Sequence, residues 1–297
     1  MKLGITMEGG ASRTVFSCGV TDALLEENIM PDYFIGVSAG IAYGVSYLSK
    51  QKGRNLVIVQ KYMNDKRYMG VRHLLKSRNF YNIPFVFDEV PNKLEAFDYD
   101  AFEAFPGKVV ACVTNIHTGK AEYLEVPRRN DKFEVLVASC ALPILFQPVK
   151  VGKHYYLDGG LSDSIPYQQA VKEGCDKNIV ILTRERGYIK KAERAGDISR
   201  KLYKRYPAIV EDLKTRPEKY NACMEELMEK EKAGEIFVIA PETTYGIGRT
   251  ESDPEKLTKL YEEGYQQAKK QMGDLKRYLG LEETTDKPRN VQEAINA

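Results

Sequence analysis

The chain has 297 residues, of which 43% are hydrophobic and 29% are charged. This composition is typical of a folded globular protein and excludes disordered and collagen-like chains. The formal net charge is only +2, so the overall charge gives no reason to expect binding to nucleic acid, which requires a clustered basic surface.

The apolar segments are short. The run before Glu8 is too short for a signal peptide, and no stretch approaches the roughly 18 apolar residues of a membrane-spanning helix. We therefore expect a cytoplasmic protein in which any contact with the inner face of a membrane comes from a local patch. No C-x-x-C pair occurs, so we expect reduced thiols, without disulfides or a zinc site, at the five cysteines: Cys18, Cys112, Cys140, Cys175 and Cys223.

The N-terminal part alternates between strand and helix patterns. Residues 2–7 form a predicted strand that runs into glycines, after which apolar residues recur at helical spacing as far as Leu24. Residues 33–37 predict a second strand, and residues 39–48 continue as an apolar helix. This β-α-β-α order predicts a parallel sheet covered by helices.

The pattern continues with further strands and an apolar helix at 133–140. Two runs rich in β-branched residues, around Val110 and Val180, indicate buried central strands. The predicted strands are 108–114, 121–126, 154–157, 178–183 and 235–240.

Three regions follow from the change in composition. Residues 1–186 form the predicted catalytic region. Residues 187–280 are richer in charged residues and tyrosine at helical spacing and include a last amphipathic helix at 254–272. Because an apolar strand interrupts these helices, we expect 187–280 to be a helical extension that contributes one strand and packs on the same domain. The tail 281–297 has few large apolar residues and is expected to fray.

The segment from Gly36 to Gly40 reads G-x-S-x-G and lies where a predicted strand passes into a predicted helix. In a nucleophile elbow the serine sits in a strained turn, and the two glycines avoid collisions with the adjoining strand and helix. The helix that begins near Ser38 also directs its free N–H groups at the reacting atoms. Ser38 is therefore a candidate nucleophile.

A second motif, Gly9-Gly10-Ala11-Ser12-Arg13, follows the first predicted strand. A backbone without bulky side chains can direct consecutive N–H groups at an anion. The loop lacks the lysine and Ser/Thr of a P-loop and the G-x-G-x-x-G spacing, which argues against a nucleotide site. The pattern favours an oxyanion hole, in which each donor contributes about 3 kcal/mol of transition-state stabilisation.

A third motif is Asp158-Gly159-Gly160, which follows the strand predicted at 154–157. Two glycines after an aspartate let the chain turn sharply and bring the carboxylate close to another loop. Most segments of this kind are simple turns. On its own, the motif makes Asp158 only a weak candidate for catalysis.

Together the three motifs resemble the patatin-like phospholipase family, in particular its bacterial members. The resemblance covers residues 1 to about 170 and includes further short stretches: Thr114-Asn115, Thr118-Gly119, and Ser139 to Pro143 followed by Phe146 and Pro148. It implies a three-layer α/β/α sandwich with a mainly parallel central sheet.

The resemblance also implies hydrolysis of a lipid or related carboxylic ester through an acyl-enzyme. In this interpretation Ser38 is the nucleophile and Asp158 is its only base. The oxyanion hole is formed by Gly9, Gly10 and Ala11 together with Arg13. Neither a metal nor another cofactor is implied.

The glycine loop departs from the family pattern G-G-G-x-R-G. Ala11 replaces the third glycine and Thr14 the last, whereas Arg13 is retained. Alanine still offers a backbone N–H to an oxyanion, provided that its φ is negative. This departure leaves open a catalytically inactive protein that keeps the fold and binds lipid.

The other alternative is an α/β-hydrolase with a Ser-His-Asp triad. The chain has only three histidines: His73, His117 and His154. In that fold a histidine follows the acid, yet none follows Asp158, and the elbow normally lies deeper in the chain than Ser38. We therefore expect the three histidines to be structural.

A mixed basic and apolar segment at 66–76 precedes several aromatic residues, Phe80, Tyr81, Phe85 and Phe87. It favours a covering helix with one solvated side over a lid or a face that rests on anionic lipid.

Overall fold

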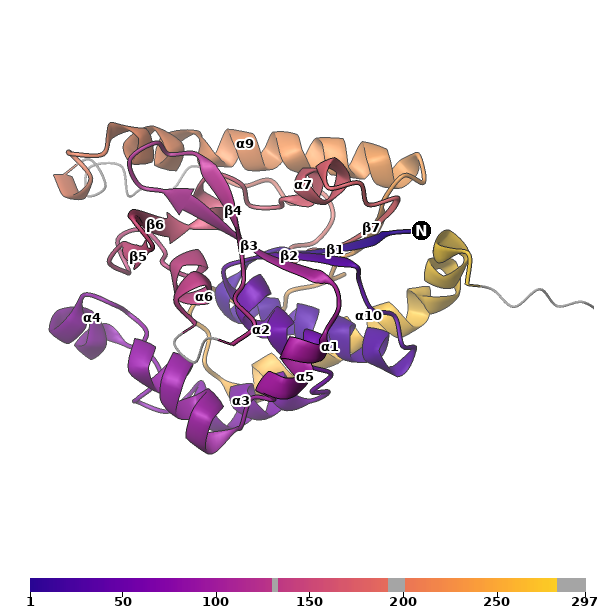
Figure 1. Cartoon of the computed structure of the whole chain (residues 1–297), viewed down its shortest axis with the longest axis horizontal. Helices are drawn as coiled ribbons and strands as arrows, with labels where there is room; N and C mark the ends of the chain where they lie inside the picture. The colour runs from indigo at the N-terminus through magenta and orange to yellow at the C-terminus, as the bar shows by residue number, and fades with distance from the viewer. Residues whose placement is uncertain (130–132, 192–200, 282–297) are drawn as a thin grey trace, which may run out of the picture.

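A computed structural model describes residues 1–129, 133–191 and 201–281 (Figure 1). Within these residues the chain forms an eight-stranded sheet in the order β5-β6-β3-β2-β1-β7-β8, with β4 paired to β3 beside this path. The strands are β1 (Leu3–Met7), β2 (Tyr33–Val37), β3 (Lys108–Asn115), β4 (Ala121–Glu125), β5 (Val149–Val151), β6 (His154–Asp158), β7 (Lys177–Ile181) and β8 (Phe237–Ile239).

The centre of the sheet is parallel. β1 pairs in parallel with β2 and β7, β2 with β3, and β7 with β8, whereas β4 and β6 run antiparallel to β3. The mainly parallel sheet predicted from the sequence is confirmed. The hairpin strand β5 was not predicted, because its three residues are too few to show a period.

Helices cover both faces of the sheet and make three layers (Figure 1). One face carries α1 (Val15–Glu26), α2 (Ala39–Leu48), α3 (Arg54–Tyr62), α5 (Tyr99–Ala104) and α10 (Pro254–Leu279), and the other carries α7 (Tyr167–Lys172) and α9 (Pro207–Lys232). The alternation of side chains along a strand explains both cores. Leu3, Ile5 and Met7 of β1 pack toward α1 and α2, whereas Tyr33 and Ile35 of β2 belong to a cluster on the other face.

Shorter helices complete the fold. They are η1 (Ala11–Thr14), α4 (Val71–Ser77), the π-helix η2 (Phe85–Leu94), α6 (Glu134–Ser139) and η3 (Gly159–Leu161). The α/β/α sandwich with a largely helical C-terminal extension is confirmed. None of the helices in the described ranges has both the length and the apolar character needed to span a membrane.

The C-terminal region contacts the rest of the fold closely. β8 pairs with β7, and α10 lies along α1. Glycines make this helix contact possible: a Cβ added to Gly264 would come within 1.9 Å of the Phe16 carbonyl oxygen, and one added to Gly19 within 2.0 Å of the Tyr261 carbonyl oxygen. The hydroxyl of Tyr261 also donates to Asp22 Oδ2 at 2.6 Å.

The last helix extends beyond the predicted 254–272 and ends at Gly280, whose φ of +67° forms a left-handed C-cap. The sequence prediction stopped at Met272 because the next residue is Gly273, which disfavours a helix interior. Most of the predicted frayed tail, 282–297, lies outside the described residues.

Candidate active site

Ser38 occupies a strained turn between β2 and α2. Its φ is +54° and its ψ is −129°, a conformation that few residues other than glycine adopt. A Cβ on Gly36 would lie 2.6 Å from the Ile41 backbone nitrogen, and one on Gly40 would lie 2.4 Å from the Met7 carbonyl oxygen. Both glycines of the G-x-S-x-G motif are therefore needed for close backbone packing, and the serine is held at the carboxyl end of the parallel strands.

Two further hydrogen bonds fix this turn. The Ser38 backbone N–H donates to Ser139 Oγ at 2.9 Å, and the Ser139 hydroxyl donates to the Cys112 carbonyl oxygen at 2.7 Å. Ser139 ends α6 and is completely buried. It therefore links the turn to α6 and β3.

Asp158 reaches the same level of the sheet from the opposite side of β3. Val37 pairs with Cys112, and Asp158 pairs with the next residue, Val113, so Ser38 and Asp158 flank one short piece of β3. A Cβ on Gly159 would lie 2.2 Å from the Cys112 carbonyl oxygen. The first glycine after the aspartate is thus required by close contact with β3.

The Asp158 carboxyl group is almost completely buried, with 1% of the residue exposed. Its Oδ1 accepts a hydrogen bond from the Gly160 N–H at 2.8 Å, and its Oδ2 has no hydrogen-bond partner among the described residues. Burial raises the pKa of Asp158, an effect opposed first by the nearby Ser38 side chain and then by the charge of Arg216. The Ser38 hydroxyl is close enough to favour the ionised carboxylate, although the two described side chains form no hydrogen bond in this conformation.

The glycine loop lies directly against the turn that carries Ser38. A Cβ on Gly9 would be 2.6 Å from the Val37 carbonyl oxygen and 2.8 Å from Ser38 Cβ. The backbone N–H groups of Gly9, Gly10 and Ala11 donate no hydrogen bond to any described residue. These donors are accordingly available to an anion beside Ser38.

Ala11 departs from the conformation that the sequence analysis required. Its φ is +50°, in the left-handed region, not negative. An L-residue pays roughly 1 kcal/mol or more for this conformation, which glycine adopts freely. A glycine at this position, as in the family pattern, would adopt the positive φ without strain. Alanine adopts it at an energetic cost.

A buried carboxylate holds the loop in position. Glu8 accepts hydrogen bonds from the Thr183 N–H at 2.6 Å and from the Thr183 hydroxyl at 3.1 Å through Oε2. Its Oε1 accepts from the Tyr220 hydroxyl at 2.9 Å. Glu8 thereby joins the end of β1 to the end of β7 and to α9.

The model of the family described as Patatin-like phospholipase matches residues 5–171, more than half of the chain. The chain belongs to this family.

Three further similarities extend this result. Residues 206–280 match a family described as a domain of unknown function, DUF6363. "Uncharacterized protein YjjU" of Escherichia coli K12 is 24% identical over 185 residues, which are 61% of this chain and 52% of that protein. The chain thus spans about half the length of this curated relative. VipD from Legionella pneumophila aligns with 92% of this chain and 67% of its own at 14% identity and a TM-score of 0.46.

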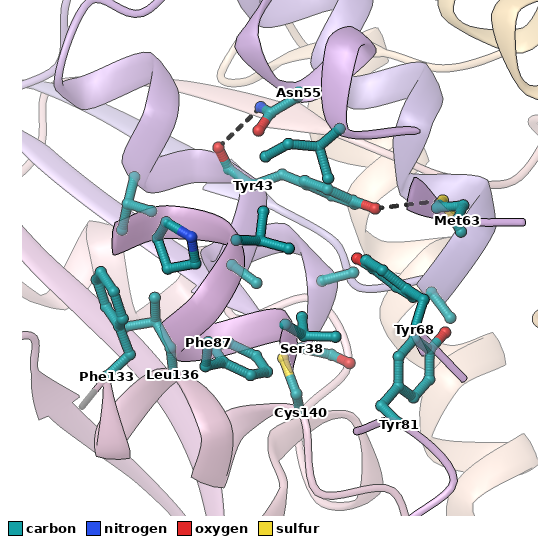
Figure 2. A pocket seen from close by; sticks show the side chains of 18 of the residues that line it. Ser38, Tyr43, Asn55, Met63, Tyr68, Tyr81, Phe87, Phe133, Leu136 and Cys140 are labelled. Atoms are coloured by element: carbon teal, nitrogen blue, oxygen red, sulfur yellow. Dashed lines mark hydrogen bonds between the residues drawn. The ribbon is translucent and has the colours of Figure 1, made fainter. Parts of the chain in front are cut away.

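In this patatin-like chain Ser38 opens into an apolar cavity of about 120 Å³ (Figure 2). Tyr68 and Tyr81 stand on one side of the serine, and Phe87, Phe133 and Leu136 stand on the other. One water needs about 10–15 Å³, so the cavity has room for roughly ten water-sized groups. Its size and apolar walls suit a fatty acyl chain.

Ser38 also borders a second, polar pocket of about 30 Å³. Its walls include the glycine loop, Asp158 and Gly160, together with a set of cationic side chains: Arg13, Arg184, Lys190, Arg216 and Arg249. Ser38, Ala11 and Leu142 line both pockets. The serine therefore lies where an apolar cavity meets a basic one.

The structure brings the residues predicted from the motifs into one place. Ser38, Asp158, Gly160 and the loop residues Gly9, Gly10, Ala11 and Arg13 all line the polar pocket. All three histidines lie in the described part of the chain, and none lines either pocket. The catalytic roles assigned to these residues stay predictions.

Sequence reasoning missed several residues at this site. Ser139 stood in a stretch that resembles the family, but nothing in the pattern indicated its hydrogen bond to the Ser38 backbone. Arg216 lies in a helix with many other charged residues, and Arg249 lies in a loop, so no spacing distinguished them. Only the fold places them beside Ser38.

The mixed basic and apolar segment forms a helix only over α4. Val71 is 63% exposed and Leu75 is 82% exposed there, and Arg72, Lys76 and Arg78 lie close to them in sequence. α4 buries none of its residues, so the favoured interpretation as a covering helix is wrong for this element. Contact of α4 with a membrane surface stays a prediction.

Proposed function

We propose that the protein is a serine acyl hydrolase that cleaves carboxylic esters of lipids through a Ser38–Asp158 dyad. One observation carries the proposal: Ser38, in its strained turn, borders both an acyl-sized apolar cavity and a pocket that contains the buried, partly unpartnered carboxyl group of Asp158. Membership in the patatin-like phospholipase family supports the same reaction class.

In the proposed first step Ser38 Oγ attacks the ester carbonyl carbon while Asp158 Oδ2 accepts the hydroxyl proton. The negative charge that forms on the carbonyl oxygen is stabilised by the N–H groups of Gly9, Gly10 and Ala11. A negative φ at Ala11 is not required for this, because at a φ of +50° its N–H donates to no described residue. The bond to the alcohol oxygen then breaks, and that oxygen takes the proton from Asp158. The product that stays bound is the acyl ester of Ser38.

Water completes the cycle by the same route. Asp158 removes a proton from a water molecule while the water oxygen attacks the acyl carbonyl carbon. The bond between this carbon and Ser38 Oγ then breaks. The proton passes from Asp158 to Ser38, and the fatty acid leaves. Burial favours this chemistry, because it raises the pKa of Asp158 and so makes the carboxylate a stronger base than an exposed aspartate.

The dyad is tested by two substitutions. We expect Ser38→Ala and Asp158→Asn each to lower ester hydrolysis by at least about 10³-fold, as is typical when one member of a concerted catalytic unit is removed. A fluorophosphonate probe should label the wild type and not Ser38→Ala. Release of fatty acid from a lipid extract, followed by mass spectrometry, gives the activity and the substrate together.

Asp163→Asn is the matched control. Burial also raises the pKa of Asp163, but this carboxyl group accepts from the Tyr123 hydroxyl and lines neither pocket at Ser38. It should keep both labelling and hydrolysis. Near-wild-type rates in both dyad variants would refute the mechanism, and absent labelling of the wild type together with binding to lipid vesicles would identify an inactive lipid-binding protein.

A further inference from the structure

Two side chains of α9 reach the candidate active site from one side of the helix. Arg216 and Tyr220 are four residues apart, a spacing that places side chains one above the other on an α-helix. Both line the polar pocket beside Ser38. They belong to the region 206–280, which matches a domain of unknown function. The pair therefore connects that region with the residues assigned to the reaction.

Arg216 contacts the loop that carries Asp158. Its Nε donates to the Gly160 carbonyl oxygen at 2.6 Å, and the N–H of the same glycine donates to Asp158 Oδ1 at 2.8 Å. Burial raises the pKa of Asp158, and the positive charge of Arg216 is one of the effects that oppose this rise. Arg216 therefore helps both to orient the carboxyl group and to keep it ionised.

Tyr220 contacts the glycine loop through Glu8, the residue before Gly9. The buried Tyr220 hydroxyl donates to Glu8 Oε1 at 2.9 Å. Glu8 Oε2 accepts from the N–H and the hydroxyl of Thr183 at 2.6 and 3.1 Å. Thr183 in turn lies against the loop, because a Cβ added to Gly10 would be 2.7 Å from Thr183 Oγ1. Tyr220 therefore helps to hold the start of the glycine loop.

The burial of Glu8 makes the contact with Tyr220 difficult to replace. Only 4% of Glu8 is exposed, so loss of the Tyr220 hydroxyl would leave a carboxylate oxygen without its donor in a place that water hardly reaches. The loop would then shift toward another donor. Because a Cβ on Gly9 would be 2.8 Å from Ser38 Cβ, such a shift changes where the loop N–H groups lie relative to the serine.

We infer that α9 positions the active site, with Arg216 as a positioning residue for Asp158 and Tyr220 as a positioning residue for the glycine loop. The inference rests on the proposed function and deepens it, because it concerns the same dyad and the same N–H donors. It gives the region 206–280 a role: one side of one helix holds the base and the loop at a fixed distance from each other.

Tyr220→Phe tests the contact with the glycine loop. It removes the hydroxyl and keeps the ring, over which the Lys190 ammonium group lies at 4.4 Å. With p-nitrophenyl octanoate as substrate, kcat should fall about tenfold while KM changes by less than about twofold. The reason is that the loop N–H groups act on a charge that forms only in the transition state.

Tyr261→Phe is the matched control for this variant. Tyr261 is also a buried tyrosine of the region 206–280, and its hydroxyl donates to the buried Asp22 carboxylate at 2.6 Å, but neither residue lines a pocket at Ser38. The control should lower the melting temperature about as much as Tyr220→Phe and keep kcat. An equal fall of kcat in both variants, or none in Tyr220→Phe, would overturn the role of Tyr220.

Arg216→Gln tests the contact with Asp158. The value of kcat/KM should fall about tenfold at about pH 8. The loss should be larger at about pH 5, because without the positive charge the carboxyl group stays protonated to higher pH. Arg216→Lys keeps the charge and should restore part of the wild-type pH profile. Lys214→Gln removes an exposed charge two residues away on α9 and should leave the profile unchanged.

The pH profile separates positioning from a merely structural role. A loss in Arg216→Gln that is the same at every pH and is not reduced in Arg216→Lys would overturn the role of Arg216.

Hydrogen exchange tests both contacts even if no ester is hydrolysed. Tyr220→Phe should speed exchange of the Thr183 N–H, and Arg216→Gln should speed exchange of the Gly160 N–H, each about threefold or more. Tyr261→Phe should leave both near the wild-type rate. Equal acceleration in this control, or none in the other two variants, refutes the inference. Failure of the proposed function appears separately, as a wild-type protein that the fluorophosphonate probe does not label.

Discussion

The two pockets that meet at Ser38 are built from different parts of the chain. The described residues that line the apolar cavity all belong to segments up to Phe146, within the part that matches the patatin-like family. The polar pocket takes Arg184, Lys190, Arg216 and Arg249 from beyond that match. The family region thus provides Ser38 and the apolar cavity, whereas the later region provides most of the positive charge of the polar pocket.

This difference teaches how a C-terminal extension adds to an existing catalytic fold. Close packing of α10 on α1 through Gly264 and Gly19 fixes the extension to the first helix. The Arg216 side chain donates to the Gly160 carbonyl oxygen, and the Arg249 backbone carbonyl accepts from Ser12, so both residues reach the loops around Ser38.

The largest expected change in substrate preference concerns the apolar cavity. Ala42 of α2 lines that cavity and not the polar pocket, so Ala42→Phe should fill the acyl site. We expect the ratio of kcat/KM between a long-chain and a short-chain ester to fall about tenfold or more, since overpacking costs about 1–3 kcal/mol. Steady-state hydrolysis of esters of increasing acyl length measures this ratio.

The same variant sharpens the comparison of the two pockets. Hydrolysis of a short-chain ester should stay near the wild-type rate in Ala42→Phe, because the change lies outside the polar pocket that contains Asp158. An unchanged preference for acyl length would show that the acyl chain binds elsewhere.

A second prediction uses the buried carboxyl group of Asp158, which lines the polar pocket. Because the pKa of Asp158 is raised in the folded protein, its protonated form favours folding, and this stabilisation is lost as the pH rises through the folded-state pKa. Ionised Asp158 therefore destabilises the protein at neutral pH. Asp158→Asn should raise the free energy of unfolding at pH 7 while abolishing hydrolysis, and denaturant unfolding at pH 7 and about pH 4 measures the change.

The gain should shrink at the lower pH, where the wild-type carboxyl group becomes protonated. Hydrolysis by the wild type should also fall as the pH drops through the raised pKa, since the base must be ionised. A loss of stability in Asp158→Asn at pH 7 would mean that the positive charges of the polar pocket dominate over burial.

The sequence predicted the fold and singled out the turn at Ser38, because both features depend on local backbone geometry. The turn at Ser38 requires glycine two positions away on each side, and the loop at Gly9 requires close approach to Val37, so both leave motifs in the sequence. The buried strands around Val110 and Val180 were predicted from their apolar runs.

The polar pocket left no such pattern. Arginines that reach a site from a helix and a loop need no glycine, no fixed spacing and no strained φ, so Arg216 and Arg249 resemble any other surface cation in the sequence. The positive φ of Ala11 could not be predicted from the sequence either, because it depends on how the first residue of η1 packs against the neighbouring loops. Residues that reach a site only through tertiary packing can be identified from the three-dimensional structure and not from the sequence.

The smallest expected effect lies at Ala11, which borders both pockets. Ala11→Gly should relieve the strain of a φ of +50° but make the unfolded chain more flexible, so we expect a net gain of about 0.5–1 kcal/mol in the free energy of unfolding. Ala42→Gly, inside α2, is the matched control and should lose about 1 kcal/mol. If Ala11→Gly instead destabilises the protein as much as the control does, Ala11 holds an ordinary negative φ in solution, and the glycine loop presents its N–H groups to Ser38 in another arrangement.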